Sequence, residues 1–285
     1  MFVRKIGVFS LAVATAVSTM SIATVSPQEE ENIPPSMVAE LDPPVLDDPA
    51  FALRVSDTFT SSDGQSGQYH LINDHVDPLE PAGMIVQLHG DGAAEFGNFT
   101  QGVEGKLSRV QAVAREQNMV LLAARTPSHD EGDPTWWRGG GLAKSNYLAE
   151  LINAVGYGGN NIDRSQVWFT GYSGGAEQLS YHFLAQHLDL VDGGGALLVG
   201  GGGNGVVSNA SSHLPENFRL HWLTGSEDVT GEFCGYCAAE RGQLHYLNQG
   251  FAGTSIEILP GYDHYELQLV EADYLSYLIS QSRTV

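Results

Sequence analysis

Positive charge is scarce in this sequence of 285 residues. Only three side chains are lysines, and 13 lysines and arginines stand against 34 acidic residues, so the formal net charge is −21 at pH 7. Nucleic acids and anionic membranes bind clustered positive charge, so this acidic balance argues against both kinds of partner. Apolar residues nevertheless make up 42% of the chain, which excludes a wholly disordered protein and suffices for a hydrophobic core.

Long hydrophobic runs are missing as well. The apolar run from Ile6 to Val17 has twelve residues, whereas a membrane-spanning helix needs about 18 or more. Arg4 and Lys5 precede this run and small residues end at Ala23, as in a cleaved secretory signal peptide. We therefore expect residues 1–23 to be a signal peptide. The mature protein is then secreted or periplasmic and has no stable membrane anchor; an uncleaved anchor is the alternative.

Residues 24–50 have the composition of a linker. They contain three consecutive glutamates and two pairs of prolines, and little that is able to pack. We expect an acidic, proline-rich linker over 24–50 and a single folded domain over 51–285.

Cysteine is nearly absent. The only two cysteines, Cys234 and Cys237, are spaced C-x-x-C. An oxidising compartment favours a disulfide between them. Free thiols or a redox role are the alternatives, although a strand leading directly into the motif, as in thioredoxin-like proteins, is not clear here. A zinc site needs two more ligands at matching spacing, and the sequence does not offer them, so we expect no metal.

From about residue 52 onwards, short apolar runs alternate with segments of helical periodicity. Strands are expected over 84–88, 119–123, 167–170, 196–199, 220–223 and 255–259. Helices are expected over 107–116, 147–155, 176–187 and 269–279. Such alternation is typical of βαβ units. We predict an α/β fold with a mostly parallel central sheet and helices on both faces, which binds ligands beyond the C-terminal ends of its strands.

The chain contains a single G-x-S-x-G segment, GYSGG at residues 171–175. The pattern alone is a weak signal, but it lies between the predicted strand 167–170 and the predicted helix 176–187. A sharp strand-to-helix turn needs glycines two residues before and after the serine, because bulkier side chains clash there. Such a turn lifts the Ser173 hydroxyl above the sheet beside a helix N-terminus, whose dipole favours developing negative charge. Ser173 is therefore the candidate nucleophile; a purely structural turn is the alternative.

A serine hydroxyl needs a base within hydrogen-bond reach. His264 is the best candidate, because it ends the loop PGYDH that follows the last predicted strand. His129, which lies in another loop, is the reserve.

The base in turn needs an acid that fixes its tautomer. Asp228 lies just beyond the predicted strand 220–223 and gives the chain order Ser, Asp, His. Glu227 and Asp263 are its rivals, although Asp263 adjoins the histidine in sequence, which is poor geometry for accepting the imidazole proton.

The negative charge that develops during acyl transfer needs preorganised backbone donors. The turn supplies one donor, the N–H of Gly174. The second is expected from the loop after strand 84–88, where the N–H of Asp91 is the first choice and that of Gly92 the alternative. His89 precedes them, and we expect it to tie this loop down by hydrogen bonding.

Together these segments resemble the α/β-hydrolase fold and, within it, the group of secreted feruloyl esterases and polyhydroxybutyrate depolymerases. The resemblance covers about residues 55–280 and is carried by VQLHG (86–90), WWR (136–138), IDRSQVWFTGYSGG (162–175) and PGYDH (260–264). It implies hydrolysis of carboxylic esters through an acyl-enzyme, without a metal or an organic cofactor. One difference is that the group commonly has a cysteine directly after His-Gly, where this chain has Asp91.

The partner that the resemblance implies is a small-molecule or polymeric ester. Trp136 and Trp137 follow strand 119–123 at the ligand-binding edge, where each either stacks on an aromatic acyl group or a sugar or packs against the core. Tyr172, beside the serine, is the third substrate-binding candidate. A serine peptidase or amidase on the same fold is the first rival function, and a non-catalytic binding protein is the second. The sequence does not indicate an oligomeric state.

Overall fold

The computed structural model describes residues 57–77, 79–97, 106–127, 134–204, 218–230 and 233–283. All of them belong to the second of two compact units of the chain, Leu41–Val285. The expected signal peptide and linker lie outside the described residues and stay predictions. In the described part, no helix is both long enough and apolar enough to cross a membrane.

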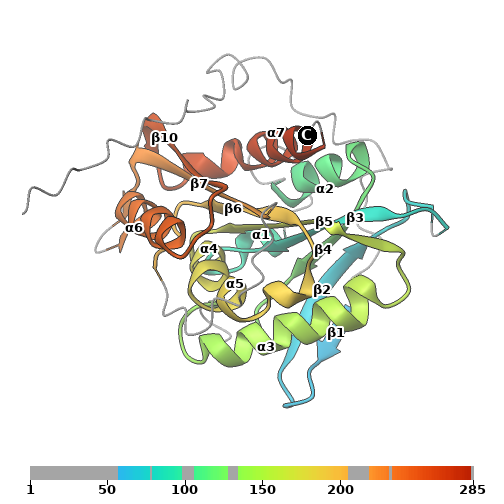
Figure 1. Cartoon of the computed structure of the whole chain (residues 1–285). Helices are drawn as coiled ribbons and strands as arrows, with labels where there is room; N and C mark the ends of the chain where they lie inside the picture. Colours follow the sequence, from blue (N-terminus) through green and yellow to red (C-terminus); the bar gives the residue numbers. More distant parts are fainter. Residues whose placement is uncertain are drawn as a thin grey trace, which may run out of the picture. The chain divides into compact units, whose positions relative to one another are not determined.

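Eight strands form one sheet at the centre of the described part (Figure 1). They are β1 (Asp57–Thr60), β2 (Ser66–Ile72), β3 (Ala82–Leu88), β4 (Met119–Ala124), β5 (Ile162–Tyr172), β6 (Gly194–Val199), β7 (Phe218–Glu227) and β10 (Thr254–Asp263). Their order is β1-β2-β4-β3-β5-β6-β7-β10. β2 is antiparallel to both of its neighbours, and the other pairs are parallel, which confirms the predicted mostly parallel sheet.

The central strands have continuous apolar sequences because helices cover both faces of the sheet. Every residue of β3, β4 and β6 is buried. The register places Ile85 of β3 between Leu121 of β4 and Trp168 of β5. β1 and β2 were not predicted, and most of their residues are partly or fully exposed, so they lack the continuous apolar pattern of the centre.

Helices pack on the two faces of this sheet. The longer ones are α2 (Lys106–Glu116), α3 (Gly141–Leu151), α6 (Gly235–Asn248) and α7 (Glu271–Ser282). The shorter ones are α1 (Ala94–Gly97), α4 (Gly174–Gln178) and α5 (Leu184–Gln186), with π-helical turns at Ile152–Tyr157 and Leu179–Phe183 and 3-10 turns at Leu188–Leu190 and Glu266–Leu269. In Figure 1, α2 and α7 lie side by side on one face, and α3 and α6 cover the other.

The ends of four parallel strands determine where the candidate site lies. The register pairs Leu88 of β3 with Gly171 of β5, and Glu227 of β7 with Asp263 of β10. His89, Ser173, Asp228 and His264 are each the first residue after one of these strands. Four parallel strands of the sheet thus place His89 and the three predicted catalytic residues at the same edge.

A small hairpin adjoins this edge. It consists of β8 (Val229–Thr230) and β9 (Phe233–Cys234), which pair in antiparallel fashion. Helix α6 begins directly after β9, and only Asp228 separates β8 from the end of β7.

Candidate active site

Ser173 occupies a sharp turn between β5 and α4. Its φ of 50° and ψ of −115° lie where residues other than glycine are rarely found. The turn is held by the backbone, since the Ser173 N–H donates to the carbonyl of Val199 at 2.8 Å and the Ser173 carbonyl accepts from the N–H of Glu177 at 3.0 Å. This is the strand–turn–helix context that the sequence predicted for the serine.

The flanking glycines are required by close backbone contacts. A Cβ on Gly171 would lie 2.7 Å from the carbonyl carbon of Gly175, so the turn folds back on itself. A Cβ on Gly175 would lie 2.6 Å from the carbonyl oxygen of Leu88 and 2.7 Å from that of His89. The turn is therefore pressed against the end of β3, and only glycine fits at both positions.

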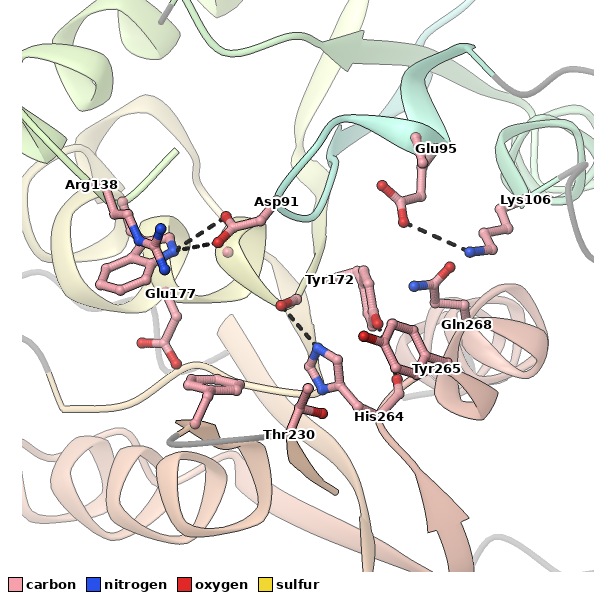
Figure 2. Close-up of a pocket in the computed structure, with 15 residues that line it drawn as sticks. Asp91, Glu95, Lys106, Arg138, Tyr172, Glu177, Thr230, His264, Tyr265 and Gln268 are labelled. Carbon is pink, nitrogen blue, oxygen red and sulfur yellow. Dashed lines mark hydrogen bonds and ion pairs between the residues drawn. The ribbon is translucent and has the colours of Figure 1, made fainter. Parts of the chain in front are cut away.

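His264 connects the serine with an aspartate. Its Nε2 lies 3.0 Å from Ser173 Oγ, a contact marked by the dashed line at His264 in Figure 2, and its Nδ1 lies 2.7 Å from Asp228 Oδ1. The imidazole is 6% exposed. Nδ1 donates to the carboxylate, which leaves Nε2 to accept the serine proton. The structure thus brings together the three residues that the sequence proposed as a triad.

Asp228 is fully buried and held by a second hydrogen bond. Thr224 Oγ1 donates to its Oδ2 at 3.0 Å, so both carboxylate oxygens have a partner. Glu227 is exposed, and Asp263 Oδ1 accepts from the N–H groups of Tyr265 and Glu266 at 2.8 and 2.9 Å. Of the three acids considered, only Asp228 meets the imidazole.

The loop after β3 is anchored by His89. The His89 Nε2 accepts from the Thr126 N–H at 3.0 Å, so the proton is on Nδ1, which donates to the carbonyl of Gly90 at 2.6 Å. Burial lowers the pKa of His89 to about 4, which keeps the ring neutral. His89 thus holds the loop in place by hydrogen bonding, as expected from its position. The reserve base, His129, lies outside the described residues.

The expected oxyanion donors come from two segments, Gly174 from the start of α4 and Asp91 from the loop after β3. The N–H of Gly92, the alternative second donor, donates to the carbonyl of Pro134 at 3.1 Å. The Asp91 carboxylate lies against Gly174, where an added Cβ would overlap it. It accepts from Trp137 Nε1 at 3.2 and 3.3 Å, and this hydrogen bond stabilises the carboxylate.

A cavity of about 650 Å³ opens over Ser173. Figure 2 shows His264 on one side of it and Asp91 on the opposite side. Glu95, Lys106 and Gln268 gather at one end, where Lys106 Nζ lies 3.7 Å from Glu95 Oε1, and Arg138 and Glu177 gather at the other. Three acidic and two basic side chains therefore line the cavity, a more even ratio than the 34 acidic and 13 basic residues of the whole chain.

Glu177 is a site residue that the sequence analysis missed. Its side chain is buried, and its Oε1 and Oε2 accept from the N–H groups of Gly202 and Gly203 at 3.1 and 3.3 Å. Burial raises the pKa of Glu177, and these two backbone donors oppose the rise. Its position one helical turn after Ser173 is the signal that would have placed it at the site.

The three aromatic candidates have different surroundings. Trp136 is fully buried in the hydrophobic core and does not line the cavity, so its assignment to substrate binding is corrected to packing. Trp137 is 38% exposed and lines the cavity. Tyr172 also lines the cavity but is buried, and its hydroxyl donates to the carbonyl of His264 at 3.1 Å, which anchors the histidine loop.

Cys234 and Cys237 are joined by a disulfide at the start of α6. The Sγ of Cys234 also accepts from the Cys237 N–H at 3.1 Å. Within the described ranges, no three histidine, cysteine or acidic side chains are grouped as metal ligands.

Comparisons with known proteins bear on the fold. No family model and no curated protein matches the sequence. Among solved structures, the chain is similar to a mutant feruloyl esterase module from Clostridium thermocellum complexed with sinapinate. The TM-score is 0.56 and the identity 16%, over 86% of this chain and 91% of that one.

Two further solved structures are similar. Est1E from Butyrivibrio proteoclasticus matches with a TM-score of 0.55 and 13% identity, over 81% of this chain and 100% of that one. The poly(3-hydroxybutyrate) depolymerase LpqC from Bordetella parapertussis matches with a TM-score of 0.54 and 13% identity, over 79% and 94%. The protein therefore has the α/β-hydrolase fold that the sequence resemblance implied, and it is similar in structure to feruloyl esterases and to a polyhydroxybutyrate depolymerase.

Proposed function

We propose that this protein is a serine hydrolase that cleaves carboxylic esters through an acyl-enzyme. The observation that carries the proposal is the hydrogen-bonded series of Ser173, His264 and Asp228 beneath an open cavity. A hydroxyl on a sharp turn, a base within hydrogen-bond reach and a buried acid behind the base are the parts that nucleophilic acyl transfer needs.

The reaction begins when Ser173 Oγ attacks the ester carbonyl carbon. His264 Nε2 takes the hydroxyl proton, and Asp228 stabilises the imidazolium that forms. The carbonyl oxygen becomes an oxyanion, which the N–H groups of Gly174 and Asp91 stabilise. His264 then gives the proton to the leaving alkoxide. A water molecule repeats the sequence on the acyl-enzyme and releases the acid.

The walls of the cavity favour a flat acyl group. Trp137, Phe233 and Tyr265 line it, and Trp137 and Tyr265 are well exposed. Aromatic walls bind planar groups by stacking. The sinapinate complex of the structurally similar feruloyl esterase module supports the same choice. We therefore propose esters of aromatic acids as substrates ahead of aliphatic hydroxyacid polyesters.

We also propose that the protein acts outside the cytoplasm after removal of residues 1–23. The signal-like pattern of these residues supports export. A disulfide between Cys234 and Cys237 fits an oxidising compartment. N-terminal sequencing of exported protein tests this proposal, and an intact Met1 would contradict it.

The proposed reaction is tested by comparing the wild type with Ser173→Ala. The wild type is expected to hydrolyse p-nitrophenyl acetate, to prefer methyl ferulate to hydroxybutyrate esters, and to react with a fluorophosphonate. Ser173→Ala should lose about 10⁴-fold or more in kcat, because it removes the nucleophile, and should not be labelled.

The rival functions predict other results in the same assays. A peptidase or amidase would be labelled by the fluorophosphonate but would prefer peptide anilides to esters. A non-catalytic binding protein would not be labelled at all. Full esterase activity in Ser173→Ala would show that the assignment of the nucleophile is wrong.

A further inference from the structure

The disulfide belongs to the segment that carries the candidate acid. Asp228 is followed by β8, and β8 pairs with β9 so that Val229 lies opposite Cys234 and Thr230 opposite Phe233. Cys234 is then joined to Cys237 in the first turn of α6. Acid, hairpin and disulfide therefore form one short, cross-linked stretch of chain.

This stretch touches both the acid and the base. Gly235, between the two cysteines, lies so close to Asp228 that an added Cβ would overlap the carboxylate. The Tyr236 N–H donates to the Asp228 carbonyl at 3.2 Å. The ring of Phe233 meets the His264 ring edge-on, with 5.7 Å between centroids. The position of the first turn of α6 thus affects the surroundings of both Asp228 and His264.

The disulfide is also within reach of small molecules. Both cysteines are only half-buried and line a second cavity of about 460 Å³. Phe233, Trp137 and Glu177 line this cavity as well as the one over Ser173, so the two cavities adjoin. We therefore expect a small thiol reagent to reach the sulfur atoms without unfolding the protein.

The stabilising effect expected of this disulfide is small. Its cysteines are three residues apart, and closing so short a loop constrains the unfolded chain by only about 2 kcal/mol in the chain-entropy model. We therefore expect the disulfide to act mainly on geometry, because it closes the turn that packs on Asp228.

We propose that the Cys234–Cys237 disulfide is a redox-sensitive positioning element, which holds the start of α6 against Asp228 and whose reduction slows catalysis. This inference rests on the proposed ester hydrolysis. The reductant is a dithiol. One of its thiolates attacks a protein sulfur and forms a mixed disulfide, and its second thiolate then displaces the protein sulfur. The protein gains two electrons and two protons, and the dithiol becomes a cyclic disulfide.

The test compares the oxidised full chain with the same protein reduced by dithiothreitol under native conditions. Alkylation of a parallel sample and mass spectrometry measure the fraction reduced. The assay uses p-nitrophenyl acetate at a temperature well below Tm. The kcat of the reduced protein should be about tenfold or more lower than that of the oxidised protein, because small displacements of a catalytic group cost large factors in rate. KM should change little, and reoxidation should restore kcat.

Two variants serve as controls. The double variant Cys234→Ser/Cys237→Ser should show the lowered kcat of the reduced protein and no response to dithiothreitol. Leu244→Ser, an exposed position of α6, should have wild-type kcat and the wild-type response. Circular dichroism checks that each sample stays folded.

The outcomes separate this inference from the function on which it rests. Equal kcat in the oxidised and fully reduced proteins, or a loss of activity that only parallels unfolding, would overturn the positioning role while ester hydrolysis stands. An oxidised protein that neither hydrolyses esters nor reacts with a fluorophosphonate would overturn the proposed function itself.

Discussion

Two walls of the candidate active site are built in different ways. The elbow wall, residues 171–175 with the loop 89–92, is held by backbone contacts: glycines press the turn against β3, and the Ser173 N–H bonds to Val199. The acid wall, residues 228–230 and 233–237 with His264, is held largely by side chains: Thr224 and His264 bind the carboxylate of Asp228, and a disulfide joins Cys234 to Cys237.

The difference shows which contacts a sequence reveals. Backbone contacts at the elbow wall leave no room for a Cβ, so glycine is required at Gly171 and Gly175 and the motif is visible in the sequence. At the acid wall, the contact between Asp228 and His264 joins residues 36 positions apart, and no local pattern marks it. Apart from the nucleophile Ser173 itself, substitutions in the elbow wall are expected to act through loss of folding and those in the acid wall through loss of rate, and three experiments test this contrast.

Among these three experiments, the largest effect is expected at the acid wall. In Asp228→Asn, kcat should fall by about 10⁴-fold, because the amide favours the wrong tautomer of His264. Tm should change little. Steady-state kinetics with p-nitrophenyl acetate measure the loss. Glu227→Gln is the matched control at the neighbouring, exposed position and should keep wild-type activity. The opposite ranking of these two variants would reassign the acid.

A second experiment concerns a buried carboxyl group behind the elbow wall. Glu271, at the start of α7, accepts from the hydroxyl of Thr170 on β5 at 2.7 Å. Burial raises the pKa of Glu271 from 4.5 to about 7, and the charge of Glu95 adds to the rise. The folded state therefore binds this proton more tightly than the unfolded state does.

The sign of the pH dependence follows. The stabilisation that protonated Glu271 gives to the folded state is fully present below pH 4.5, and it is lost as the pH rises through about 7. The pKa difference corresponds to about 3 kcal/mol in the free energy of unfolding. Glu271→Gln keeps an acceptor for Thr170 but cannot ionise, so it should be more stable than the wild type at pH 8 by up to this amount, and by much less at pH 5. Urea unfolding at both pH values measures the difference in the free energy of unfolding between the variant and the wild type. An equal difference at pH 5 and pH 8 would contradict the raised pKa of Glu271.

The third experiment compares one glycine from each wall. Gly175→Ala places a Cβ against the carbonyl oxygens of buried β3 and its loop, which are unable to move, and should destabilise the fold by about 1–3 kcal/mol or more. Gly235→Ala places a Cβ against the Asp228 carboxylate, and should lower kcat about tenfold with a smaller change in Tm. Gly97→Ala, in open space, should change neither quantity. Similar losses of Tm in the first two variants would abolish the distinction between the walls.

Much of the fold was predictable. The central strands were predicted because burial on both faces requires continuous apolar residues, as in Met119–Ala124. Helix α6 was missed for a physical reason. Its buried face consists mainly of small residues such as Ala239 and Gly242, while Leu244 and Leu247 are exposed. Small residues allow close packing on the sheet, but they give no apolar periodicity.

The candidate site was predictable in part. Ser173 and His264 each follow a strand that the sequence reveals, and the structure places them 3.0 Å apart. Trp136 and Trp137 are adjacent in sequence, yet one lies in the core and the other lines the cavity. Phe233 went unnoticed, because only the packing of the hairpin brings it to His264.

The amino-acid sequence by itself determined the alternation of strands and helices and the glycine-flanked turn at Ser173, since these depend on constraints among neighbouring residues. The tertiary structure alone decided which acid meets His264, which tryptophan lines the cavity, and that the disulfide lies beside Asp228. These choices depend on distances between residues far apart in the chain, and such distances exist only once the sheet, its helices and the hairpin have packed together.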